Sequence, residues 1–144
     1  MPASFHFLDD VALADLAFDA EGDSIQELFA AASNAVMEAM ADPSTVGATW
    51  ERREEHADGD LASLLFDWLS DLVYWKDAAG VVFSRAAMSL IQEGDQWKLI
   101  ATMIGEPVSQ ARQSLRNDVK GVTKHLYRLH QENGRWHVRV VLDV

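Results

Sequence analysis

The feature that most constrains the fold is an alternating segment at the end of the chain, G-R-W-H-V-R-V-V-L-D-V over residues 134–144. Successive side chains of an extended strand point to opposite faces. One face would carry Trp136, Val138, Val140 and Leu142, and the other His137, Arg139, Val141 and Asp143. The pattern is typical of a strand that is buried on one side and ends in charge. The chain is therefore expected to build a sheet with one face packed on a core.

Alternating and extended segments elsewhere predict partner strands. Asn133 and Gly134 form an Asn-Gly pair, which favours a tight hairpin turn before the last strand. The run W-E-R-R-E-E is polar and best fits an exposed strand edge. The expected strands cover residues 4–8, 46–56, 81–92, 97–105 and 119–130, with another beginning close to Asp15.

Two amphipathic segments predict helices. Ser24 and Glu27 have the spacing of a capping box at the start of the first helix, which an Asp-Pro pair ends. Asp60 is the expected N-cap of the second helix, which has a continuous apolar face over residues 61–73. We therefore expect an α+β fold in which two helices pack on an antiparallel or mixed β-sheet, in a single domain spanning residues 1–144.

Composition excludes several classes of function. The chain has no cysteine, which excludes disulfides, thiolate zinc sites and cysteine nucleophiles. Its net charge of −11 argues against strong nucleic-acid binding, because affinity for a phosphate backbone comes from lysine and arginine. The start has no signal-peptide pattern and no apolar run reaches ~18 residues, so we expect a soluble, cytoplasmic protein without a membrane span. P-loop, G-x-G-x-x-G and G-x-S-x-G patterns are missing, which argues against a self-contained enzyme.

Acidic groups at strand ends indicate a cation site. Asp143 and the α-carboxylate of Val144 place two oxygen donors at the rim of the sheet, and Asp15 is the candidate for a third. Carboxylates gathered at one point repel, and a divalent cation removes that penalty. Oxygen ligands favour calcium, magnesium or manganese over zinc. The alternative is that Asp15 caps a strand, Asp143 is a solvated terminus and Lys120 pairs with a surface acid.

Six segments occur in order along the chain: G-D-S-I-Q-E-L-F, D-L-A-S-L-L-F-D-W-L-S-D-L, G-V-V-F, G-E-P, D-V-K-G-V-T-K-H and V-V-L-D-V. Together they resemble the archease family over essentially the whole length. The resemblance implies a small metal-binding protein that activates the GTP-dependent RNA ligase called RtcB. That ligase joins 3′-phosphate or cyclic-phosphate RNA ends to 5′-hydroxyl ends in tRNA splicing and RNA repair. An archease promotes guanylylation of the ligase and does not join RNA itself.

The resemblance also implies metal ligands. The family's N-terminal His-Thr-Ala-Asp motif falls on residues 12–15, where Asp15 matches while Ala12 and Leu13 replace the histidine and the threonine. The family's acidic C-terminus falls on Asp143 and Val144. The implied metal pair is therefore intact, with calcium as the first expectation and magnesium or manganese as alternatives. The change at Ala12 and Leu13 places the sequence in a divergent branch of the family.

Two further residues are implied to contact the partner. The family's Val-Lys-Ala-Val-Thr segment falls on residues 119–123, with Lys120 as the matching lysine. His125 is the matching histidine. The resemblance implies that both residues face the ligase or its nucleotide site.

Other classes of function stay open. A chaperone-like interaction module for RNA-processing or RNA-modifying enzymes would use the acidic helix face around Asp67, Asp71 and Asp77, without a functional metal site. A small metal-dependent hydrolase would need an acid–base pair that the sequence does not identify. Metal dependence of partner activation separates the chaperone-like module from the RNA-ligase activator.

Overall fold

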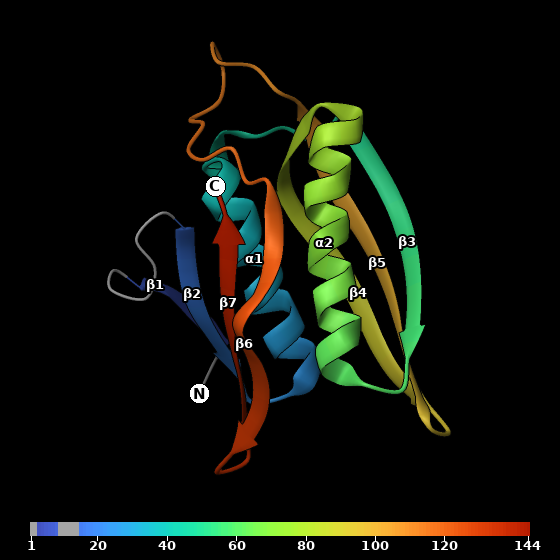
Figure 1. The fold of residues 1–144 in the computed structure, drawn as a ribbon. Coiled ribbons are helices and arrows are strands. Elements are labelled where there is room, and N and C mark those ends of the chain that lie inside the picture. Colours follow the sequence, from blue (N-terminus) through green and yellow to red (C-terminus); the bar gives the residue numbers. More distant parts are fainter. Residues whose placement is uncertain (1–2, 9–14) are drawn as a thin grey trace.

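The structure is a computed structural model that describes residues 3–8 and 15–144 (Figure 1). A short 3₁₀ helix, η1 (Pro43–Thr45), follows the first α-helix. The other elements of this part of the chain are β1 (Ser4–Leu8), β2 (Asp15–Gly22), α1 (Ile25–Met40), β3 (Trp50–Asp58), α2 (Leu61–Ala79), β4 (Val81–Glu93), β5 (Gln96–Pro107), β6 (Gly121–Glu132) and β7 (Arg135–Asp143).

The strands form two antiparallel sheets, with orders β1-β2-β7-β6 and β3-β5-β4. Each helix packs against strands of both sheets: α1 against β2, β7 and β4, and α2 against β6 and all three strands of the second sheet (Figure 1). The α+β fold with two helices is confirmed, whereas the sequence did not show that the strands divide into two sheets. Helices with apolar residues over much of their surface can bury it against strands on two sides.

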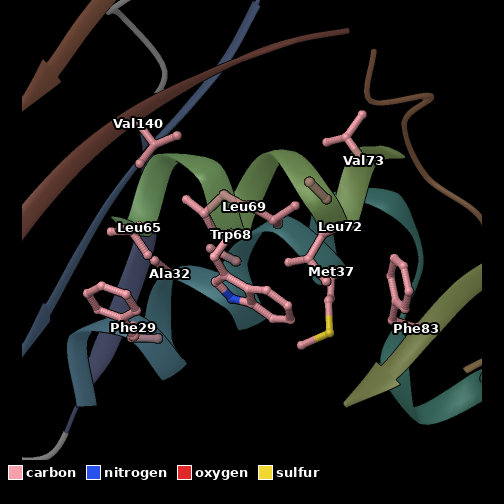
Figure 2. Close-up of a cluster of buried hydrophobic side chains, with 14 of the residues drawn as sticks. Phe29, Ala32, Met37, Leu65, Trp68, Leu69, Leu72, Val73, Phe83 and Val140 are labelled. Atoms are coloured by element: carbon pink, nitrogen blue, oxygen red, sulfur yellow. The ribbon is translucent and has the colours of Figure 1, made fainter. Parts of the chain in front are cut away.

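The core lies where the two helices meet. Trp68 of α2 is fully buried, and its ring extends toward α1, near Phe29 and Met37 (Figure 2). Its indole Nε1 donates to Ser33 Oγ at 2.8 Å, and that hydroxyl donates to the Phe29 carbonyl at 2.6 Å. A polar atom that is buried needs such a partner, so this short chain of hydrogen bonds fixes α2 against α1.

The predicted starts of both helices are confirmed. Ser24 and Glu27 form the capping box, with the Glu27 amide donating to Ser24 Oγ at 3.1 Å. Asp60 caps α2 by accepting from the Ser63 amide at 3.1 Å. Gly80 ends α2 in the left-handed conformation, at φ 65°, which glycine adopts without steric cost. Both helices are therefore delimited by local chemistry.

Two strands begin later than the sequence predicted. β3 starts at Trp50 rather than at residue 46, because its pairing with β5 starts at the Trp50–Gly105 pair, while Val46 caps η1. β6 starts at Gly121 rather than at residue 119, opposite Asp143. Among the residues described, no helix is both long enough and apolar enough to cross a membrane.

Candidate metal centre

The register of β2 against β7 brings the two predicted acids together. Asp15 pairs directly with Asp143, and Gly121 of β6 pairs with Asp143 from the other side. Residues directly opposite each other in an antiparallel pair have Cβ atoms ~4.5–5.5 Å apart and share one face. Asp15 is half-buried and Asp143 is exposed. Two carboxylates from opposite ends of the chain therefore start from neighbouring positions at the rim of one sheet.

The carboxylate pair differs from another acid on the same face of β2. Asp19 lies opposite Arg139, whose Nε and Nη2 donate to the two carboxylate oxygens at 2.8 and 2.9 Å. This contact lowers the pKa of Asp19 below its ordinary value. Asp15 faces a second carboxylate instead, and within the described residues neither it nor Asp143 forms an ion pair with a basic side chain. Like charges directly opposite destabilise a sheet, so this donor set fits a bound cation.

The backbone of Lys120 is fixed beside Asp143. The Lys120 amide donates to the Asp143 carbonyl at 2.7 Å, and the Lys120 side chain is exposed. The preceding residues are held by Lys76 of α2, whose Nζ donates to the Val119 carbonyl at 2.6 Å and to Asp118 Oδ1 at 2.7 Å. Burial opposes the charge on Lys76, but its carboxylate partners outweigh that effect and raise its pKa. The lysine predicted to contact the ligase thus lies at the same rim as the acid pair.

The remaining predicted residues are placed less tightly. Val144 is half-buried and packs against the core. His125 is exposed and lies four residues beyond Gly121, roughly 13 Å along an ideal strand, in a stretch where the β6–β7 register shifts. Ala12 and Leu13 lie outside the described residues. The structure therefore groups the two acids and the lysine but leaves His125 further along β6.

A groove of about 510 Å³ lies on the same sheet. Among its lining residues, Asp19, His137 and Arg139 alternate in register with the acid pair, so they share its face. The rings of His130 and His137 stack in this groove, with centroids 5.2 Å apart. The face that carries the acid pair therefore also has a hollow with mixed charge.

The structure also assembles a cluster that the sequence did not predict. Glu54 and His56 of β3 lie next to Asp71 of α2, with one ligand atom from each within 4.8 Å of the others. In the sequence the five histidines show no metal-ligand spacing, and nothing there indicates His56 because its partner Asp71 comes from a different element. The only local signal is the E-x-H alternation, which places Glu54 and His56 on one face of a strand.

These features define one α+β domain over the described residues, with two helices packed against two antiparallel sheets. The chain belongs to the archease family: residues 5–144 match the model of the Archease protein family (MTH1598/TM1083). A protein archease of Methanothermobacter thermautotrophicus is 36% identical over 140 residues, covering 97% of this chain and 98% of the relative. A protein archease of Methanopyrus kandleri is 30% identical over 131 residues, covering 91% of this chain and 94% of the relative.

Two solved structures share the fold. The solution structure of Methanobacterium thermoautotrophicum protein 1598 has a TM-score of 0.83 at 36% identity and covers 97% of this chain and 98% of its own. The crystal structure of a Thermotoga maritima archease, described as a possible chaperone, has a TM-score of 0.62 at 21% identity. It covers 96% of this chain and 98% of its own. At that identity the second likeness shows the fold alone.

Proposed function

We propose that this protein binds a divalent cation at Asp15 and Asp143 and activates a GTP-dependent 3′-phosphate RNA ligase of the RtcB type by promoting guanylylation of the ligase. Membership of the archease family supports the proposal. The structural observation that carries it is the direct pairing of the two acids, without a basic partner among the described residues. The protein then serves tRNA splicing or RNA repair in the cytoplasm, as an activator and not as the enzyme.

The roles of the residues follow from their chemistry. Asp15, Asp143 and the carboxylate at Val144 would hold the cation, and such oxygen donors suit calcium first, with magnesium or manganese as alternatives. A cation held there supplies positive charge near the phosphates of the ligase's nucleotide. Lys120 adds a second positive charge from the same rim, and His125 offers a further contact to the ligase. Guanylyl transfer needs positioning and charge neutralisation, which these groups provide without a covalent intermediate on this chain.

The chaperone-like alternative has less support. It relies on the acidic face of α2, yet Asp71 is hydrogen-bonded to His56 and Asp77 lies 3.0 Å from Lys76. Both acids are therefore already engaged within the protein. The alternative stays a prediction that the experiment below separates from the activator.

The test is guanylylation of the cognate ligase by GTP, with this protein at substoichiometric amounts. Wild type is expected to support many ligase turnovers, and Asp143→Ala to lose stimulation and calcium binding while keeping its circular dichroism spectrum. Asp95→Asn is the matched control, because Asp95 is an exposed acid in the β4–β5 turn of the other sheet. Deleting Val144 moves the terminal carboxylate onto Asp143 and is expected to weaken calcium binding.

Two outcomes would contradict the proposal. Full stimulation by Asp143→Ala would show that the carboxylate pair is not needed. If wild type gives no stimulation with any divalent cation, the altered motif at Ala12 and Leu13 has redirected the protein, and the interaction module becomes the leading function.

A further inference from the structure

Three metal-ligating groups meet between the second sheet and α2, away from the acid pair. Glu54 and His56 are two positions apart on β3, and both bond to residues of α2. Asp71 of α2 places its Oδ2 2.5 Å from His56 Nε2, and one ligand atom from each of the three lies within 4.8 Å of the others. Zinc binds nitrogen and oxygen at ~2.0–2.2 Å, so small side-chain movements suffice for one ion to contact all three.

Neighbouring side chains hold Glu54 in place. Its Oε1 accepts from Trp75 Nε1 at 2.8 Å and from Arg52 Nε at 2.6 Å, and the Arg52 guanidinium lies 3.7 Å over the ring of Trp75. Outer contacts of this kind orient the ligands of metal sites. Arg52 brings one positive charge against three nearby carboxylates, those of Glu54, Asp71 and Asp67, so negative charge outweighs positive charge among these side chains.

We propose that Glu54, His56 and Asp71 form a binding site for a divalent cation of borderline hardness, zinc first. One imidazole nitrogen and two carboxylate oxygens are a three-ligand set that leaves a fourth position for water. The three side chains are 19%, 23% and 27% exposed, so a cation and water can reach them. The all-oxygen pair on the other sheet suits a harder ion, and the new site does not depend on the function proposed above.

The site would join an edge strand to a helix. β3 is an outer strand of its sheet, and α2 packs against it (Figure 1). His56 Nε2 and Asp71 Oδ2 are hydrogen-bonded at 2.5 Å, and a bound cation would take the place of the proton between them. Because the ligands come together only in the folded chain, binding stabilises the native state.

The experiment titrates zinc into the full-length protein against a chromophoric chelator and follows the melting temperature in parallel. Wild type is expected to bind one equivalent of zinc that raises the melting temperature. His56→Ala and Asp71→Asn are each expected to lower zinc affinity by at least about tenfold and to abolish the rise. Asp71→Asn is nearly isosteric and keeps a hydrogen-bonding group beside His56, so it tests the ligand with least disturbance of the fold.

Control variants separate this site from others. Glu55→Gln removes a carboxylate from the opposite face of β3, where it pairs with Arg53, and is expected to leave zinc binding unchanged. Asp143→Ala is expected to leave it unchanged as well. The proposal is overturned if wild type binds no zinc, or if folded Asp71→Asn binds it as tightly as wild type. It is also overturned if zinc binding is lost only on changing Asp143 or His137.

Discussion

Replacing Lys76 with methionine tests how the rim of the acid pair is held together. Lys76 is 9% exposed and donates to the Val119 carbonyl at 2.6 Å. Methionine has a similar length but cannot donate, so that carbonyl loses its partner. A hydrogen bond to a charged group contributes ~1.5–3 kcal/mol, and we expect a loss of about 2 kcal/mol. With an unfolding entropy of about 2.1 cal/mol/K per residue, this lowers the melting temperature by roughly 7 °C.

The assay is urea unfolding followed by circular dichroism, with Lys98→Met as the control. Lys98 is more exposed and lies 3.3 Å from the exposed Glu55, so its replacement is expected to cost less than about 0.5 kcal/mol. The pKa of Lys76 is raised in the folded protein. Its contribution to the free energy of unfolding is therefore fully present below about pH 10.5 and is lost as pH rises through the higher pKa of the folded state. If the two variants unfold at the same urea concentration, the buried contact of Lys76 does not contribute as argued.

Two further predictions concern the core and the first sheet. Ser33→Ala leaves the buried indole N–H of Trp68 without its acceptor and is expected to cost about 1–3 kcal/mol in urea unfolding; an unchanged midpoint would show that the bond is dispensable. Arg139→Gln removes the main cause of the lowered pKa of Asp19, which should return toward 3.8 in a carboxyl NMR titration. In wild type the contribution of Asp19 to the free energy of unfolding is present above pH 3.8 and is lost as pH falls through the folded pKa. The stability of the variant should therefore no longer fall over this acidic range on account of Asp19.

The candidate site shows how far sequence reasoning reached. The sequence predicts Asp15 and Asp143 as ligands because both are acids at strand ends and both match the family resemblance, and the structure pairs them across β2 and β7. No local pattern specified that pairing, because every antiparallel register forms the same backbone hydrogen bonds. The register is selected by burying Phe18 and Val140, which share the inner face of the sheet and have no exposed surface.

Lys76 and the cluster at His56 illustrate what the sequence left out. Lys76 falls on the last turn of an apolar helix, where nothing indicates that it reaches across to Val119. His56 meets Asp71 because α2 packs against β3, a contact between two elements that each look ordinary alone. Such groups are found only once packing has brought separate elements together.

The sequence by itself determined the two helices with their caps and the last strand, but not where β3 and β6 begin. Ser24, Asp60 and Gly80 delimit the helices through bonds within a few residues, and alternation defines the last strand. Tertiary structure alone decided that the strands divide into two sheets and which side chains meet at each rim. The physical reason is the separation along the chain of the residues that interact. Caps and turns are satisfied by neighbouring residues, whereas sheet order and register depend on how two helices bury their apolar faces between distant strands.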